Sequence, residues 1–314
     1  MLINTHATSN CKNIKTTPNQ IQLPITTNLI WLLLVLNSHL ITPNDHKFVI
    51  GGVGVGFFSM FLGMLNNLDY ADRHHKTPVI DCNFGYFAYK NTDGYNGSMN
   101  PWEYYFEPVS DLQYSPGDKI HTAFKAPDNT QCLYNCKDGY DQKYRNKWFG
   151  VINKHIKLKP NIIHKIDFFY ENYIASKITV GIHLRGTDKG SEVKQIPPEV
   201  ILARANNIAS KLGKDVQFLV ATDEEKLLTL AKSKLNGHVI FYNATRYNNF
   251  KFYKSINGIP VFVDPNILNK ALLGEEVLIE ANLLARCNVL VHTLSNVSLA
   301  ISFFNPTLVL ETLV

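Results

Sequence analysis

The second half of the chain alternates between short apolar runs and segments with helical spacing, and this order constrains the fold more than any other feature. Short apolar runs bounded by turn residues are typical of buried strands, and the longer segments repeat apolar residues at helical intervals. Such alternation predicts a parallel sheet with right-handed crossovers and helices on both faces. The predicted strands are residues 178–184, 216–221, 238–242, 289–292 and 307–310, and the predicted helices are residues 198–212, 224–234, 272–286 and 295–304.

The first half opens in a similar way. Residues 47–53 predict a strand that runs into glycines, residues 57–73 a helix and residues 78–81 a second strand, which is the start of a βαβ unit. Residues 82–140 are rich in Asn, Gly, Asp, Tyr and Pro, and a stretch this long without strong periodicity is typical of a functional loop region or an excursion from the sheet. Residues 140–173 predict two helices broken at a proline.

These patterns predict an α/β fold with two Rossmann-like domains, each a parallel sheet flanked by helices. We place the boundary near Ser176, which gives an N-terminal domain of residues 1–176 and a C-terminal domain of residues 177–314. Residues 1–22 are polar and lack periodicity, so they predict a flexible N-terminal arm.

Composition and charge exclude several classes of protein. Apolar residues make up 45% of the chain and charged residues 18%, which excludes a disordered chain, a coiled coil and a collagen-like repeat. Lys and Arg (31) exceed Asp and Glu (26) by 5, and the excess is spread along the chain. This balance suits a local phosphate site better than a nucleic-acid groove, so we expect no nucleic-acid partner.

The longest apolar run, LIWLLLVL at residues 29–36, has 8 residues, whereas a membrane span needs about 18. A secretory signal remains open because its apolar region needs only about 7 to 15 residues, but no A-x-A-like cleavage site follows. A helix or strand packed on the first domain is the favoured interpretation. We therefore expect at most peripheral membrane association and favour a cytoplasmic location.

The five cysteines are too few and too scattered for a disulfide scaffold. Cys132 and Cys136 are close in sequence, but no second Cys or His pair follows at zinc-finger spacing. Free thiols or one loop disulfide are favoured over a metal site, and we predict no metal centre.

Four glycines, Gly51, Gly52, Gly54 and Gly56, stand between the first predicted strand and its helix. Glycines at this point let the backbone approach a ligand and expose helix N–H groups to an anion, with Gly54 and Gly56 as the candidates for the contact. The spacing does not fit G-x-G-x-x-G, and a purely structural turn explains it equally well. A nicotinamide-dependent oxidoreductase would use this turn, with Asp81 binding the ribose.

The sharpest candidate site is the segment HLRGTDKGSE at residues 183–192, which follows a predicted strand. Ligands of open α/β sheets bind beyond the carboxyl ends of the strands, where this segment falls. Alternation along the strand places His183 and Arg185 on one face, so that both can meet one ligand. Arginine suits phosphate oxygens, and Lys189 adds a point charge. A strand-end ion pair among Arg185, Asp188 and Lys189 accounts for the pattern equally well.

This segment resembles the H-x-R-x-T-D-K motif of fucosyltransferases with the GT-B fold, the group that contains the nodulation fucosyltransferase, the core α-1,6-fucosyltransferases and, more distantly, protein O-fucosyltransferases. FLVATDE at residues 218–224 is similar to the strand and acidic turn that follow in those enzymes. Residues 274–298 are similar to their last donor-binding helix, strand and Ser-rich turn. The resemblance covers most of residues 177–314 in the same order and implies two domains that face each other across a cleft.

The resemblance implies roles for residues around the diphosphate of GDP-fucose. Arg185 would hold the β-phosphate and Lys189 would assist it. Ser295 and Asn296 would offer hydroxyl, amide and backbone N–H groups to the pyrophosphate. Glu192 lies near the position of a proposed catalytic carboxylate, although it stands one residue closer to Lys189 than in the core enzymes.

The resemblance also implies the residues around the nucleoside. His183 would contribute to the guanosine pocket, and Asp223 would lie beside the ribose or base. Glu280 would accept hydrogen bonds from guanine N–H groups, at a position where the family usually has Asp. Two further departures are Gly186, where the core enzymes carry a second arginine, and a chain that ends at a strand without a return helix.

The implied activity is metal-independent, inverting transfer of fucose from GDP-β-L-fucose to a hydroxyl of a glycan, lipid-linked or protein acceptor, with no cofactor besides the donor. No Asp-x-Asp occurs in the chain, and Arg185 and Lys189 can replace a metal in stabilising the departing pyrophosphate. Glu192 is the first candidate for the base and Asp188 the second.

Two alternatives remain open besides this enzyme. One is a sugar-nucleotide or glycan binding module that has lost catalysis, and the other is the oxidoreductase that would use the glycine turn. Four aromatic residues could stack on a sugar, but a core position is favoured for them: Trp102, Tyr104, Tyr105 and Phe106.

Overall fold

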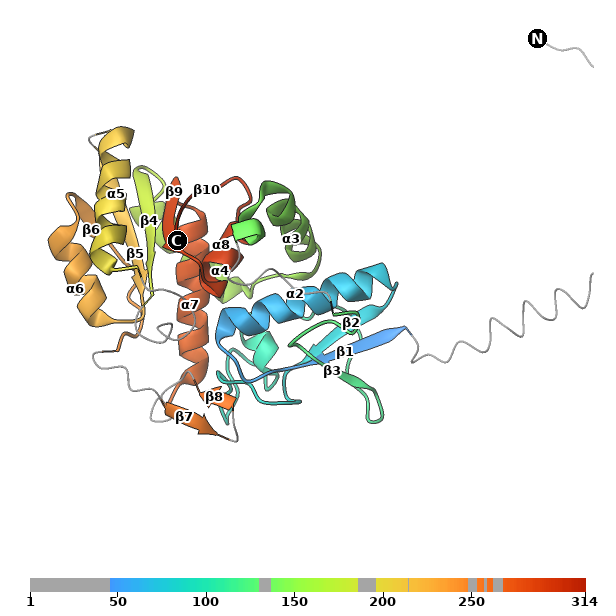
Figure 1. Cartoon of the computed structure of the whole chain (residues 1–314). Coiled ribbons are helices and arrows are strands. Elements are labelled where there is room, and N and C mark those ends of the chain that lie inside the picture. The colour runs from blue at the N-terminus through green and yellow to red at the C-terminus, as the bar shows by residue number, and fades with distance from the viewer. Residues whose placement is uncertain are drawn as a thin grey trace, which may run out of the picture. The chain divides into compact units, whose positions relative to one another are not determined.

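The computed structural model describes residues 46–129, 137–185, 196–213, 215–247, 253–256, 259–261 and 268–314 (Figure 1). Several residues singled out from the sequence lie outside these ranges and are not discussed structurally. They are the predicted arm at residues 1–22, the apolar run at residues 29–36, Cys132, Cys136, Gly186, Asp188, Lys189 and Glu192.

A three-stranded parallel sheet forms the N-terminal part, with the strand order β2-β1-β3. The strands are β1 (Lys47–Gly51), β2 (Thr77–Asp81) and β3 (Ile120–Thr122). Helix α2 (Phe57–Arg73) connects β1 to β2 and is buried along most of its length. The predicted βαβ opening is therefore confirmed. Strand β3 was missed because only three residues pair, within a stretch that shows no periodicity.

A five-stranded sheet forms the C-terminal part, with the order β10-β9-β4-β5-β6 and parallel pairing throughout. Its strands are β4 (Ile178–Leu184), β5 (Val216–Thr222), β6 (His238–Ile240), β9 (Val289–Thr293) and β10 (Val309–Leu313). Its helices are α5 (Pro198–Leu212), α6 (Glu225–Lys234), α7 (Lys270–Ala285) and α8 (Asn296–Phe304). All nine elements agree with the predicted alternation to within a few residues at each end.

The helices cover both faces of this sheet, as Figure 1 shows. Alternate strand residues such as Val180 and Ile182 pack with α5 and α6, whereas Leu219 and Leu290 pack on the side of α7 and α8. Within this sheet the first strand along the sequence is the central strand β4. Strands β5 and β6 follow on one side of it, and β9 and β10 then follow on the other side. The strand order therefore reverses between β4 and β9.

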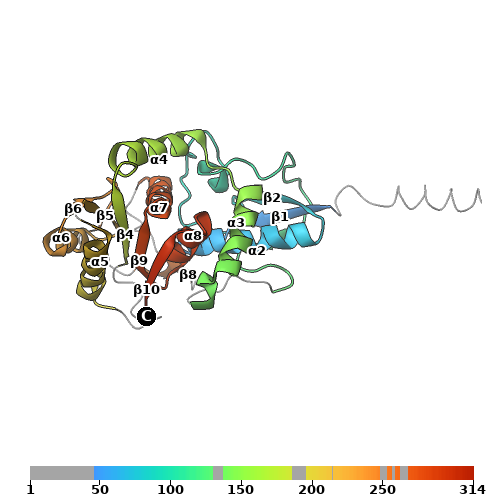
Figure 2. The ribbon, with the colours of Figure 1, turned by 90° about the horizontal axis from the view of Figure 1, so that it is seen from above.

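Helices α3 (Gln142–His155) and α4 (Pro160–Tyr173) connect the two sheets, and the break between them falls where Pro160 opens α4. Helix α3 packs against α8 and α2, as seen from above in Figure 2, and α4 packs against α7. One apolar core continues from α2 to α7 and α8. The described residues all belong to one compact unit, Asp45–Val314. The domain boundary near Ser176 stays a prediction.

The aromatic residues of the N-terminal part belong to this core. Trp102, Tyr104, Tyr105 and Phe106 lie in and after the 3₁₀ helix η1 (Pro101–Tyr104) and are almost fully buried, so the favoured core interpretation is confirmed. The hydroxyl of Tyr105 donates to the carbonyl of Ala271 in α7 at 3.0 Å, which ties the two parts together.

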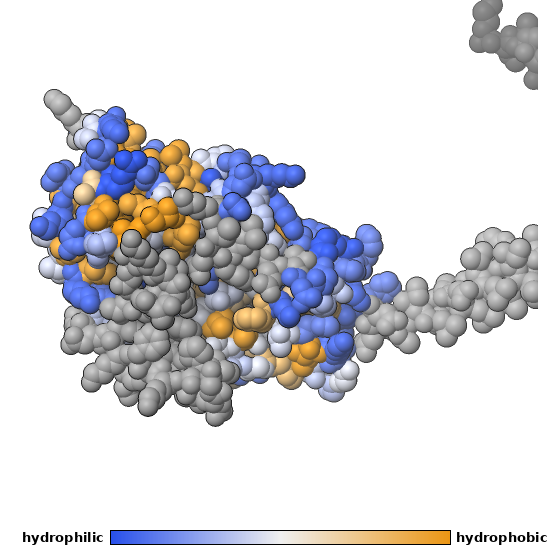
Figure 3. Space-filling view, in the orientation of Figure 1, coloured by the Kyte–Doolittle hydropathy of each residue, from blue (hydrophilic) through white to orange (hydrophobic). Residues whose placement is uncertain are grey.

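The remaining described elements are the 3₁₀ helix η2 (Lys137–Tyr140) and an antiparallel hairpin of β7 (Tyr253–Ile256) and β8 (Ile259–Val261). The face in Figure 3 is largely hydrophilic, with apolar areas between the polar residues. Among the helices that the structure describes, none has both the length and the apolar character needed to span a membrane.

Candidate functional site

A cavity of about 410 Å³ lies at the point where the strand order of the C-terminal sheet reverses. Open α/β sheets bind ligands there, outside the carboxyl ends of the strands. Its size falls in the range of small-molecule sites. The walls are residues 55–59 and Tyr89 from the N-terminal part, and residues 183–185, 221–223, 244–245, 247, 273, 276–277, 280–281, 284 and 296–297 from the C-terminal part.

Six of the residues predicted from the sequence line this one cavity. They are Gly56, His183, Arg185, Asp223, Glu280 and Asn296. Gly54 and Ser295 are buried beside it and are not among the lining residues. Lys189 and Glu192 are outside the described residues. The fold thus brings together groups that are up to 240 positions apart in the sequence, from Gly56 to Asn296.

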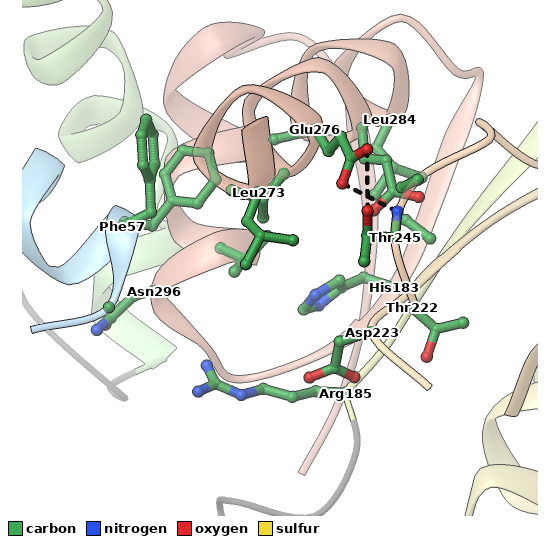
Figure 4. Close-up of a pocket in the computed structure, with 18 of the residues that line it drawn as sticks. Phe57, His183, Arg185, Thr222, Asp223, Thr245, Leu273, Glu276, Leu284 and Asn296 are labelled. Atoms are coloured by element: carbon green, nitrogen blue, oxygen red, sulfur yellow. Dashed lines mark hydrogen bonds between the residues drawn. The ribbon is translucent and has the colours of Figure 1, made fainter. Parts of the chain in front are cut away.

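Arg185 is the first residue after the central strand β4. The register pairs Leu184 with Thr222, so Arg185 and Asp223 are the next residues on two neighbouring strands. Figure 4 shows the guanidinium of Arg185 extending along the cavity toward the side on which Asn296 lies. His183, two residues earlier, faces the same cavity, as strand alternation predicts.

The start of α8 forms the side of the cavity opposite the strand ends of β4 and β5. The Ser295 hydroxyl accepts from the backbone N–H of Ser298 at 3.0 Å, so this side chain caps the helix and is 1% exposed. Tyr140, which the sequence did not single out, bonds to Ser298 Oγ at 2.9 Å and to the Ser295 carbonyl at 3.2 Å. These bonds fix the turn and leave Asn296 as its polar residue that lines the cavity, next to the apolar Val297.

The side-chain amide of Asn296 is the polar group at the start of α8 that lines the cavity. Its Oδ1 is buried and has no hydrogen-bond partner among the described residues. Buried polar atoms are normally paired with protein or water, and an amide oxygen can pair only with an N–H or O–H donor, so the NH₂ group of this amide is the part that suits a phosphate oxygen. The amide lies at the N-terminus of α8, where the helix dipole favours negative charge.

The other end of the cavity is acidic. Glu276 and Glu280 are four residues apart and therefore lie on one face of α7. Glu276 accepts from the backbone N–H of Thr245 at 2.9 Å and from its hydroxyl at 3.3 Å (Figure 4). Glu280 accepts from Arg246 at 3.1 Å. The sequence analysis did not predict three residues of this end: Thr245, Arg246 and Glu276. For Glu276 the available signal was its spacing of four residues from Glu280 on a predicted helix.

The carboxyl of Glu280 has a strongly perturbed pKa. Burial raises the pKa of Glu280 to about 8, the charges of Glu276 and Asp223 add to the increase, and Arg246 opposes it. Its side chain is 12% exposed. A perturbed carboxyl with specific charged neighbours, in a cavity wall, is typical of a functional site.

The wall from the N-terminal part is apolar and aromatic. Phe57 and Tyr89 meet edge to face with ring centroids 5.6 Å apart, and the backbone N–H of Phe57 donates to the Tyr89 hydroxyl at 3.3 Å. At Gly56, which precedes Phe57, an added Cβ would meet no atom within 4 Å. The missing side chain therefore leaves room in the cavity itself.

The two ends of the glycine turn differ: Gly51 is closely packed, whereas Gly56 borders open space. A Cβ at Gly51 would lie 3.0 Å from Ile120 Cγ2 and 3.1 Å from the Phe84 carbonyl oxygen, so this glycine allows a close approach of chain segments. Asp81, the expected ribose ligand of the oxidoreductase alternative, does not line the cavity, and its carboxylate accepts from the Asn83 N–H at 2.9 Å.

The described residues contain no group of three or more His, Cys, Asp or Glu side chains arranged to hold a metal ion. Within the same residues Cys82 and Cys287 are buried free thiols, and burial raises the pKa of both. Neither thiol lines the cavity.

Comparison with solved structures finds similar folds, whereas no family model and no curated protein sequence matches the chain. A mutant of Arabidopsis thaliana FUT1 in complex with GDP aligns with a TM-score of 0.50 and 11% identity, over 92% of this chain and 74% of that one. The NodZ α-1,6-fucosyltransferase soaked with GDP-fucose gives a TM-score of 0.47 and 18% identity, over 83% and 94% of the chains. POFUT1 in complex with GDP gives 0.46 and 10%, over 86% and 98%.

These structures are fucosyltransferases of the group whose motifs the sequence resembles. The predicted fold class, a GT-B-like α/β fold with parallel sheets flanked by helices, is confirmed by the sheets themselves and by the alignment with FUT1. The chain therefore has the fold of the fucosyltransferase FUT1.

Proposed function

We propose that the protein is a glycosyltransferase that transfers fucose from GDP-β-L-fucose to a hydroxyl group. The observation that carries the proposal is the charge arrangement of one cavity: a guanidinium and a helix N-terminus at one end, and the two glutamates of α7 at the other. Arg185 and the start of α8 suit a diphosphate. Asp223 and Glu280 suit the ribose hydroxyls and the N–H groups of guanine.

The fold supports this assignment of the cavity. FUT1, which shares the fold, was solved in complex with GDP. In this chain His183, Arg185, Asp223, Glu280 and Asn296, the residues that the fucosyltransferase motifs imply for the donor, come from four separate elements and line the same space.

The proposed reaction is a single displacement. The acceptor oxygen bonds to the anomeric carbon of fucose, the bond from this carbon to the β-phosphate oxygen breaks, and GDP leaves with the bonding electron pair. Arg185 stabilises the charge that develops on the diphosphate, with Lys189 as its proposed partner. The acceptor proton passes to a base, for which Glu192 is the first candidate and Asp188 the second. The β-linked donor would give an inverted product.

We propose that the transfer needs no metal, because the guanidinium of Arg185 lines the cavity and a cation there can stabilise the charge of a departing diphosphate in place of a metal. Turnover should be unchanged by EDTA. Loss of turnover in EDTA with recovery on adding Mn²⁺ would contradict a metal-free reaction. The acceptor is proposed only as a glycan, lipid-linked or protein hydroxyl.

Isothermal titration with GDP, GDP-fucose, GDP-mannose and NAD tests the proposal directly, followed by assays of donor hydrolysis and transfer. We expect GDP and GDP-fucose to bind and NAD not to bind. Binding without hydrolysis or transfer to any acceptor would favour a binding module that has lost catalysis. Tight binding of NAD without binding of GDP would overturn the proposal.

A further inference from the structure

Arg246 is a buried cation directly behind the acidic end of the cavity. Its side chain is 4% exposed and does not line the cavity. It donates to Glu280 Oε1 at 3.1 Å, to the carbonyl of Ala244 at 3.0 Å and to the carbonyl of Tyr242 at 2.8 Å. The guanidinium also lies over the ring of Phe241, 5.3 Å from its centroid. One side chain thus joins the segment after β6 to the cavity face of α7.

Two of the partners of Arg246, Glu280 and Ala244, line the part of the cavity at which a nucleoside would bind. The same segment contributes Ala244, Thr245 and Tyr247 to the cavity. Thr245 holds Glu276 through two hydrogen bonds, and Arg246 holds Glu280 one helical turn further along α7. Both glutamates are therefore oriented by neighbouring residues of one short segment.

We propose that Arg246 is the positioning residue of the nucleoside end: it orients the carboxyl group of Glu280 toward the cavity, favours its charged form, and so sets the pH range in which the cavity binds GDP. This inference rests on the proposed function only for the identity of the ligand. The hydrogen bonds of Arg246 are all to protein atoms and do not depend on which ligand binds.

The charges around Glu280 decide how strongly its ionisation depends on Arg246. Burial raises the pKa of Glu280 to about 8, and the carboxylates of Glu276 and Asp223 act in the same direction. Arg246 lowers this pKa both by its charge and by its hydrogen bond. The titratable and charged groups on the elements that surround Glu280 are Glu276 on α7, His183 and Arg185 at the end of β4, Asp223 after β5, Tyr242, Arg246 and Tyr247 after β6, and Tyr89.

The direction of the pH effect follows from these charges. Guanine offers N–H donors on two adjacent nitrogens, and a carboxylate can accept from both, whereas a protonated carboxyl turns one of its oxygens into a donor. Below pH of about 8 the free protein holds Glu280 protonated, so GDP binding must release a proton, and affinity falls up to tenfold for each pH unit below that value. Without Arg246 the midpoint of the Glu280 titration moves to higher pH, because an adjacent cation lowers a carboxyl pKa by about 1 to 3 units.

The test compares the wild-type protein with Arg246→Gln, Arg246→Lys and the control Arg204→Gln. Arg204 also bonds to a glutamate, Glu311 at 2.8 Å, but on the surface of the C-terminal sheet. Carbon-13 NMR reads the titration of the Glu280 carboxyl in the ligand-free protein, with Glu280→Gln identifying the signal. Calorimetry from pH 6 to 9, in buffers of different ionisation enthalpy, reads GDP affinity and proton release.

We expect Arg246→Gln to raise the Glu280 midpoint by at least about one pH unit and to weaken GDP binding about tenfold at pH 7. Arg204→Gln should change neither. Arg246→Lys keeps the charge but not the planar fork, so it should raise the midpoint by less than Arg246→Gln. If Arg246→Gln does not fold, the lysine variant carries the test, and a midpoint equal to or below the wild-type value overturns the inference.

The remaining outcomes separate the two proposals. An unchanged midpoint in a folded Arg246→Gln protein that still binds GDP overturns the role of Arg246 and leaves the proposed function intact. A raised midpoint in a protein whose wild type binds no GDP at any pH overturns the proposed function, and with it the link to GDP, while the coupling of Arg246 to Glu280 is confirmed.

Discussion

The two walls of the cavity differ in chemistry. The wall from the C-terminal sheet carries the charged groups, Arg185, Asp223, Glu276 and Glu280, whereas the wall from the N-terminal part is formed by the turn at Gly56 with aromatic side chains behind it. The first wall consists of strand ends and two helices that converge at the point where the strand order reverses. The second is the start of a helix whose remaining length is buried in the core.

This difference suggests that the two walls bind different parts of the proposed donor. The charged wall has Arg185 at one end, with Asp223 beside it, and the two glutamates of α7 at the other end, which matches a nucleoside diphosphate along its length. The aromatic wall offers no charge among the described residues that line it, and it matches a sugar ring better than a phosphate. Variants on the first wall should therefore change GDP binding, and variants on the second should affect only ligands that carry the sugar.

Arg185→Ala is the strongest test of the charged wall. Loss of a charge-assisted contact to phosphate should weaken GDP binding on the order of 100-fold in calorimetry. The fold should survive, because Arg185 follows the last residue of β4 and does not pack in the core. Arg204→Ala is the matched control, since Arg204 lies on α5 and pairs with Glu311. Wild-type GDP affinity in Arg185→Ala would break the assignment of the diphosphate to this wall.

Glu280→Gln tests the acidic end through stability. The pKa of Glu280 is about 8 in the folded protein, above its ordinary value of 4.5, so the folded state binds more protons than the unfolded state between these pH values. Glu280 therefore makes folding less favourable as pH rises from about 4.5 to about 8, and the full cost is present above that range.

The variant removes this titration. Between pH 5 and pH 9 its unfolding free energy should fall by at least about 1 kcal/mol less than that of the wild type, as measured by urea unfolding. Glu311→Gln, which alters a surface ion pair with Arg204, should follow the wild-type pH profile. Parallel profiles for wild type and Glu280→Gln would show that the acidic end is not perturbed by burial.

Variants of the neighbouring residues Ser295 and Asn296 should affect different properties, the first stability and the second GDP binding. Ser295→Ala removes the helix cap and should lower the unfolding free energy by about 1 kcal/mol with little effect on GDP binding. Asn296→Ala removes the amide that faces the cavity and should weaken GDP binding about fivefold to tenfold with little loss of stability. Thermal unfolding and calorimetry on both variants check the pair. The opposite pattern would place the ligand contact at Ser295.

The sequence predicted this turn but not which residue of it faces the cavity. Ser is among the preferred N-cap residues, and the capping bond to Ser298 turns its hydroxyl inward, so the preference of helix ends could have assigned Ser295 to the fold and Asn296 to the ligand. Strands such as β4 were predictable because their apolar pattern is local.

Contacts between distant segments were not predictable in this way. Arg246 and Glu280 are 34 positions apart, and nothing in the local pattern of either residue indicates their pairing. Strand β3 has three residues, too few for alternation to be recognised. The acidic end of the cavity therefore depends on tertiary structure, whereas Arg185 and its strand could be found from the sequence alone.

The aromatic wall has its own test, with the smallest expected effect. At Gly56 and at the solvent-exposed Gly150 of α3, an added Cβ meets no atom within 4 Å. Gly56→Ala should therefore fold normally and bind GDP as the wild type does, but bind GDP-fucose about twofold to fivefold more weakly, because the methyl group occupies space in the cavity. Gly150→Ala should leave both affinities unchanged and stabilise α3 by about 0.5 to 1 kcal/mol. Equal weakening of GDP and GDP-fucose binding would mean that the turn contacts the nucleotide, and the two walls would then share the diphosphate.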